Sequence, residues 1–190
     1  MSEKPILFSG PMVKAILDGR KTMTRRVLKP KKYACLISDG WADEYVLDPG
    51  NAEWLVQYLK FMIGDLLWVR EEFSGPWAVT GRPPSQWSTI DPIWYWADGN
   101  PEDGDWTKPK PSIHMPRWAS RISLRVTAVK VERLQDISED DAEAEGCDFF
   151  GDQTLAYKGK FAALWAEIHG PGAWDANPWV AAYSFERVKP

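Results

Sequence analysis

Two blocks of opposite charge are the part of this sequence best suited to chemistry. Residues 14–32 carry a local charge of +7, which leaves −11 on the rest of a chain whose net charge is −4. Clustered Lys and Arg side chains supply the sequence-independent affinity of proteins for phosphate. Residues 132–152 reverse the sign, with nine acidic residues against Arg133 alone. The basic block therefore predicts a phosphate-binding site, unless the two blocks face each other or solvent.

The aromatic residues suggest a second kind of contact. The 190 residues include twelve Trp, and such numbers either fill a core or build surfaces on which bases stack. Two of them, Trp68 and Trp118, adjoin Arg70 and Arg117 in the sequence and are the candidates for lining a ligand site. Because the protein is acidic overall, a local site for a nucleotide or a single strand fits better than binding to long duplexes.

Metal and redox chemistry have little support in the sequence. Cys35 and Cys147 show no metal-binding or redox spacing, so we expect two reduced thiols. With only His114 and His169 as imidazoles, a zinc site built on histidines is close to excluded. No metal and no cofactor is therefore expected.

Membrane insertion and secretion are not expected either. The longest apolar stretches, such as Leu66–Val69, are far shorter than the roughly 20 residues that span a bilayer. Met1–Pro11 has no sustained apolar segment and no small-residue cleavage site of a secretory signal. We expect a cytoplasmic protein, while the sequence leaves its oligomeric state open.

The local patterns predict an α+β chain of one domain, residues 1–190, whose core is a small, strongly bent sheet or barrel. Residues 74–118 hold eight of the fifteen Pro and six of the twelve Trp, which predicts an ordered, elaborated loop region. Helices are expected after Ser9, with Gly19 as the stop, after Ser138 as a cap, and around Phe161–Ile168. The expected strands are Thr22–Leu28, Leu66–Val69, Ile93–Trp96, Ile122–Val131 and Pro178–Val188.

One segment after the first helix resembles a known family. Gly19-Arg20-Lys21-Thr22-Met23-Thr24-Arg25-Arg26 matches the pattern Gly-x-Lys-x-x-x-x-Arg of the activating-signal-cointegrator homology (ASCH) domain. Gly64-Asp65 before Leu66–Val69 resembles the family's turn before a strand, and Leu134–Gly146 resembles its late strand and short helix. Met115–Ile122 and Asn177–Val180 are similar to segments of larger ASCH proteins from bacteriophages and prophages.

The resemblance implies a PUA-like β-barrel with flanking helices and a nucleoside or single-stranded nucleic acid, with RNA favoured, as the ligand. One branch of the family is a 4-acetylcytidine amidohydrolase, whose catalytic Lys, Thr and Glu fall on Lys21, Thr24 and Glu145. A second branch is described as a single-strand ribonuclease. A third possibility is a non-catalytic binder of RNA or a modified nucleotide. The residues expected to contact substrate are Arg20, Arg25, Arg26, Trp68, Arg70, Arg117 and Trp118.

Amide hydrolysis makes specific demands on the three candidate catalytic residues. A Thr hydroxyl is a weak nucleophile unless a base takes its proton. Lys21 can be that base only when neutral, which at an ordinary pKa of about 10.4 holds for about one molecule in 2,500 at pH 7. Burial and the neighbouring arginines would lower that pKa, whereas Glu145 would raise it. On an ideal strand Lys21 and Thr24 point to opposite faces, so Lys21 should lie in the turn after Gly19.

Overall fold

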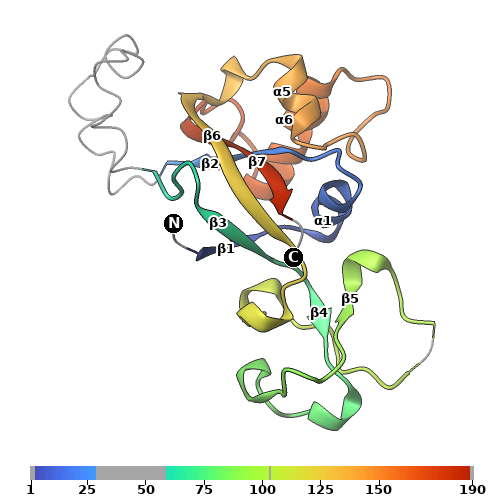
Figure 1. Cartoon of the computed structure of the whole chain (residues 1–190). Coiled ribbons are helices and arrows are strands. Elements are labelled where there is room, and N and C mark those ends of the chain that lie inside the picture. The colour runs from blue at the N-terminus through green and yellow to red at the C-terminus, as the bar shows by residue number, and fades with distance from the viewer. Residues whose placement is uncertain (1–2, 29–58, 103, 189–190) are drawn as a thin grey trace. The chain divides into compact units, whose positions relative to one another are not determined.

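The computed structural model describes residues 3–28, 59–102 and 104–188 (Figure 1). Three lysines of the basic block, Lys29, Lys31 and Lys32, lie outside these residues, as does Cys35. The chain divides into two compact units. The first unit comprises Met1–Gly19, Asp65–Arg125 and Glu186–Pro190, and the second comprises Arg20–Gly64 and Val126–Phe185.

The main sheet is mixed and has five strands in the order β1-β3-β6-β7-β2. The α+β prediction is confirmed, and so are the four strands predicted for one sheet, although the described pairings do not close that sheet into a barrel. The strands are β1 (Glu3–Leu7), β2 (Met23–Val27), β3 (Leu66–Arg70), β6 (Ser123–Arg133) and β7 (Trp179–Val188). The helices are α1 (Gly10–Leu17), α5 (Glu139–Ala144) and α6 (Tyr157–His169).

In the first unit, β1 pairs parallel with β3, and β3 pairs antiparallel with the start of β6. The sequence patterns did not predict β1, because it is short and contains Pro5. A proline cannot donate to a ladder and is tolerated on an edge strand, which is the place of β1 in the sheet. Helix α1 ends as predicted, and Gly19 follows with a φ of +77°, which a glycine adopts at little cost.

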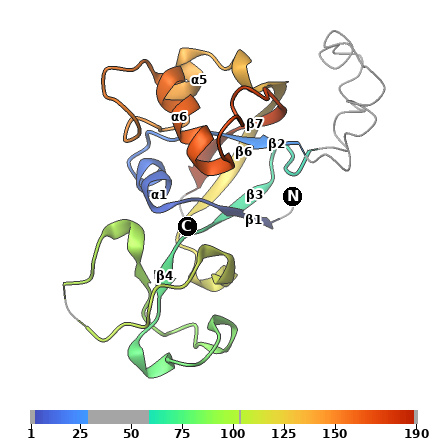
Figure 2. The ribbon, with the colours of Figure 1, turned by 180° about the vertical axis from the view of Figure 1, so that it is seen from behind.

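The predicted loop region of residues 74–118 consists mainly of short helices and connecting loops (Figure 2). Buried side chains in it and at its borders form a small core of their own. Phe73 packs edge-on against Trp87 with ring centroids 5.7 Å apart. The predicted strand at 93–96 is β5 (Trp94–Tyr95), which pairs with β4 (Phe73–Ser74). The region also contains the 3-10 helices Trp77–Val79, Pro84–Gln86, Trp96–Asp98, Ser112–His114 and Arg117–Ala119. Of its tryptophans, Trp87 is buried in this core and Trp118 packs against it, whereas Trp77 is 66% exposed.

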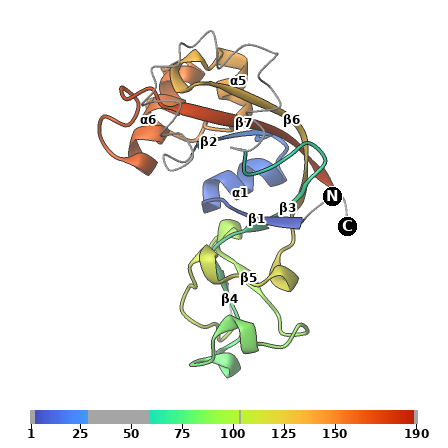
Figure 3. The same cartoon turned by 90° about the vertical axis from the view of Figure 1, so that its left-hand side faces the viewer.

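The second unit combines β2 and β7 with two helices (Figure 3). Strand β2 pairs antiparallel with β7, which places Thr24 opposite Tyr183. Helix α5 contacts both α6 and β2. It begins at the predicted cap, where the Ser138 hydroxyl accepts a hydrogen bond of 3.1 Å from the Asp141 amide. This arrangement brings the acidic segment around α5 against the basic residues of β2.

Candidate functional site

The residues of the Gly-x-Lys motif lie where the chain enters β2. Residues 20–22 form the turn before that strand, as expected for Lys21. The Thr22 amide donates to the Ala144 carbonyl at 2.9 Å, and the Thr22 carbonyl accepts from the Phe185 amide at 2.9 Å. These two bonds fix the turn between the end of α5 and strand β7.

Lys21 is buried, with 2% of its surface exposed, and forms an ion pair with the buried Glu145. Its ammonium donates at 2.8 Å to each of three oxygens: Glu145 Oε2, the Glu145 carbonyl and the Met23 carbonyl. Burial lowers the pKa of Lys21 below its ordinary value, while the carboxylate of Glu145 opposes that shift and Arg26 adds to it. Lys21 therefore loses its proton more easily here than it would in water, although Glu145 stabilises its ammonium form.

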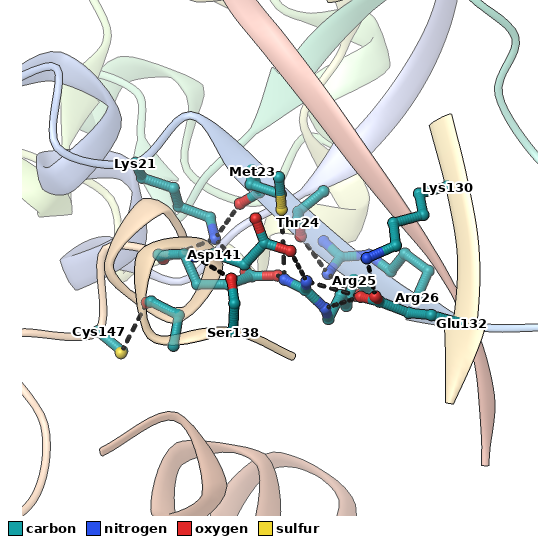
Figure 4. A network of polar contacts seen from close by, with 12 residues as sticks. Lys21, Met23, Thr24, Arg25, Arg26, Lys130, Glu132, Ser138, Asp141 and Cys147 are labelled. Carbon is teal, nitrogen blue, oxygen red and sulfur yellow. Dashed lines mark hydrogen bonds and ion pairs between the residues drawn. The ribbon is translucent and has the colours of Figure 1, made fainter. Parts of the chain in front are cut away.

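Arg25 is the centre of the network, because its buried guanidinium contacts three carboxylates (Figure 4). Its Nε and Nη2 donate to Glu132 Oε1 at 2.9 and 2.7 Å, and Nη2 also donates to Asp141 Oδ2 at 2.7 Å. Nη1 donates to Glu145 Oε1 at 3.2 Å. Burial by itself would lower the pKa of Arg25, but the carboxylates raise it above its ordinary value. The sequence suggested that Arg25 contacts substrate, whereas this geometry directs it inward to acidic side chains.

Thr24 and Arg26 alternate with Arg25 along β2 and contact each other. The Thr24 hydroxyl is buried and accepts a hydrogen bond of 2.8 Å from Arg26 Nη1. This bond uses an oxygen lone pair and leaves the hydroxyl proton for another acceptor. Burial lowers the pKa of the half-buried Arg26, an effect that Glu145 and Tyr183 oppose. Thr24 therefore lies beside a cation that belongs to the same electrostatic cluster as Lys21 and Glu145.

The basic and acidic blocks face each other over the part of the chain that the structure describes. Arg20 pairs with Asp148 at the surface, while Lys21 and Arg25 pair with buried carboxylates. This was one of the two arrangements that the sequence left open. It means that Lys21 and Arg25 are compensated by acids rather than displayed as a positive surface.

The other predicted contact residues lie in the first unit. Arg70 and Arg117 both stack on Trp68, with guanidinium carbons 4.5 and 6.0 Å from the ring centroid. Arg117 also forms an ion pair with Glu3. Trp118 is half-buried against the core around Phe73. The structure thus groups Trp68 with Arg70 and Arg117, and gives Trp118 a packing role.

Sequence reasoning missed two members of the network, Glu132 and Asp141. Both belong to the acidic block, but its nine carboxylates offered no local signal for which ones turn inward. Strand periodicity placed apolar residues on the buried face of β6, whereas Glu132 near its end is 2% exposed. Its ion pairs with Arg25 across the fold and with Lys130 on the same strand explain that burial.

The chemistry available to this arrangement is proton transfer and anion stabilisation. A buried lysine with a lowered pKa, a hydroxyl and an arginine are the parts of a nucleophilic site. No group of three or more His, Cys, Asp or Glu in residues 3–28, 59–102 and 104–188 is arranged to hold a metal ion. Within the same ranges, no helix is both long and apolar enough to cross a membrane.

The chain is α+β, and its Gly-x-Lys motif lies at the start of β2 beside this network. No protein-family model and no curated protein matches the chain. The solved structures that it resembles include the ASCH domain from Lactobacillus crispatus, at 14% identity and a TM-score of 0.42, covering 98% of this chain and 79% of that one. A protein from Enterococcus faecalis, described under the family model DUF984, is similar at 14% identity and a TM-score of 0.44, covering 99% and 80%.

Proposed function

We propose that the chain is an amidohydrolase that removes an acyl group from N4-acylated cytidine or a related modified base. The observation that carries the proposal is the buried ion pair between Lys21 and Glu145, 2.8 Å long and formed by residues 124 positions apart. The resemblance assigns catalytic roles to both residues and to Thr24, which lies on the adjoining strand. Buried titratable groups with a perturbed pKa are typical of active sites.

In the proposed reaction, Thr24 Oγ1 attacks the acyl carbon of the substrate amide while neutral Lys21 accepts the hydroxyl proton. The lowered pKa of Lys21 increases the neutral fraction that this step needs. Once protonated, Lys21 is stabilised by Glu145 and transfers the proton to the leaving amino nitrogen. Water then hydrolyses the acyl ester on Thr24 and restores the hydroxyl. In this proposal Arg26, which donates to Thr24 Oγ1, stabilises the oxyanion of the tetrahedral intermediate.

The charge distribution favours a nucleoside over a long polynucleotide as the substrate. Affinity for polynucleotides depends on many uncompensated cations, and the described basic block is largely paired with acids. In this proposal Arg20 and Arg26, in the same unit as Lys21 and Thr24, are the candidates for contacts to base, ribose or phosphate. A non-catalytic binder and a single-strand ribonuclease are the alternatives that the test below distinguishes.

The test is incubation of the purified chain with 4-acetylcytidine, followed by mass spectrometry of the products. We expect cytidine and acetate from the wild type, and no product from Thr24→Ala or Lys21→Arg, because a guanidinium is not a base in this pH range. Thr22→Ala is the matched control, since Thr22 is exposed two positions before Thr24, and it should keep its activity.

Three outcomes would contradict the proposal. Turnover by Thr24→Ala equal to the wild type would exclude Thr24 as the nucleophile. Ligand binding without turnover, preserved in Lys21→Arg, would identify a binder instead. Cleavage of single-stranded RNA in a parallel incubation, measured with and without a chelator, would identify a nuclease.

A further inference from the structure

Glu145 is held by two different cations, one on each oxygen. Oε2 accepts from Lys21 Nζ at 2.8 Å, and Oε1 accepts from Arg25 Nη1 at 3.2 Å. Glu145 directly follows α5 as its C-cap residue and is 4% exposed. The orientation of its carboxylate toward Lys21 therefore depends on what fixes Arg25.

Arg25 is fixed from two other elements. Glu132 on β6 accepts from Nε and Nη2, and Asp141 on α5 accepts from Nη2. Its side chain is completely buried, and the planar guanidinium presents its donors in a rigid fork. A lysine at this position would retain the charge, but its single ammonium could not donate hydrogen bonds to the three carboxylates in the same geometry.

We propose that Arg25 is a positioning residue: anchored by Glu132 and Asp141, it fixes the carboxylate of Glu145 and limits how strongly Glu145 holds the ammonium of Lys21. The effect of Arg25 on catalysis rests on the proposed function, whereas its effect on the titration of Lys21 does not. Arg25 acts through Glu145 and touches neither the substrate nor the reacting atoms.

The expected consequence is a change in how Lys21 titrates. The charged or titratable groups that act on Lys21 are Glu145 at the end of α5, Arg26 on β2 and Cys147 after α5. If Arg25 releases Glu145 Oε1, the carboxylate interacts with Lys21 alone, which favours the ammonium form. The pH at which Lys21 becomes neutral then rises, and each pH unit of that rise lowers the neutral fraction at neutral pH by about tenfold.

The experiment compares the full chain carrying Arg25→Lys or Glu132→Gln with the wild type. Arg133→Lys is the matched control, because Arg133 is in the same unit but stacks on Trp179, 4.4 Å from the ring centroid. The first measurement is kcat and KM for 4-acetylcytidine as a function of pH. The second is the titration of the Lys21 side chain by nitrogen-15 NMR, which needs no turnover.

For Arg25→Lys we expect kcat at neutral pH to fall by about tenfold with little change in KM, and the acid limb of the pH profile to move upward. Glu132→Gln should move the acid limb of the pH profile upward by a smaller amount than Arg25→Lys. Arg133→Lys should leave both the pH profile and the Lys21 titration unchanged. An unaltered Lys21 titration in both network variants would overturn the positioning role even if the enzyme is active. A wild type without turnover would overturn the proposed function, and the NMR titration would still decide whether Arg25 controls Lys21.

Discussion

Replacing Arg25 by methionine should cost the protein about 3–5 kcal/mol of its free energy of unfolding. The substitution keeps much of the side-chain volume but removes the cation that Glu132 and Glu145 contact inside the protein. Both carboxylates are almost completely buried, whereas Asp141 is 25% exposed and can be hydrated. The loss therefore arises mainly because two buried carboxylates each lose one cationic partner: in the described part of the chain, Glu145 keeps only Lys21, and Glu132 keeps only the ion pair with the exposed Lys130.

The matched comparison is Arg20→Met, which removes the ion pair between Arg20 and Asp148. Both of those side chains are about 40% exposed, so this variant should lose less than about 1 kcal/mol. The assay is urea unfolding at neutral pH, followed by circular dichroism and by hydrogen exchange of the β2 amides. Adding Glu132→Leu to Arg25→Met should recover part of the loss, because it removes one of the two buried carboxylates that lost Arg25 as a partner.

Equal losses for Arg25→Met and Arg20→Met would refute this reasoning. That result would mean that the energetic difference between the buried network and the surface pair does not follow from burial. A double variant less stable than Arg25→Met would refute it as well, since removing a buried carboxylate that has lost its buried cation should increase stability.

Two further predictions concern other parts of the chain. Burial, with a contribution from Glu145, raises the pKa of Cys147 from 9.0 to about 11, so the unfolded state ionises first and stability falls as pH rises through that window. Compared with Cys147→Ala, the wild type should lose up to about 3 kcal/mol between these pH values in urea titrations, and parallel pH profiles would contradict this. Gly75→Ala should destabilise the 74–118 region by about 1–3 kcal/mol, because the new Cβ would lie 2.6 Å from the Trp87 ring. Limited proteolysis should detect the change, while Gly10→Ala, with an ordinary 3.7 Å contact, should resist cleavage like the wild type.

The elements with strong local signals could be predicted from the sequence. Ser138 with Asp141 three residues later defined the start of α5, and Gly19 marked the end of α1. Alternation of apolar residues located β6 and β7. In β6 the buried residues Leu124 and Val126 alternate with exposed ones, whereas in β7 the first five residues, Trp179–Tyr183, are all buried. These signals involve residues close together in the sequence, so they can be recognised without knowledge of the tertiary structure.

The elements that depend on distant partners could not be predicted in this way. Strand β1 exists because its five residues pair with β3, more than 60 positions later, and its own pattern with Pro5 does not specify a strand. The 74–118 region likewise owes its order to Phe73, Trp87 and Met115, which meet only when the chain folds back.

The candidate site also has features that the sequence determined and features that only the tertiary structure decided. The sequence determined that Lys21, Thr24 and Arg25 stand together in one short segment, and that a carboxylate-rich segment follows much later. Tertiary structure decided that Arg25 meets Glu132, 107 positions away, and that Lys21 meets Glu145. The physical reason is that the strength of a charge pair depends on separation and burial, and both quantities are set when β2, β6 and α5 pack together.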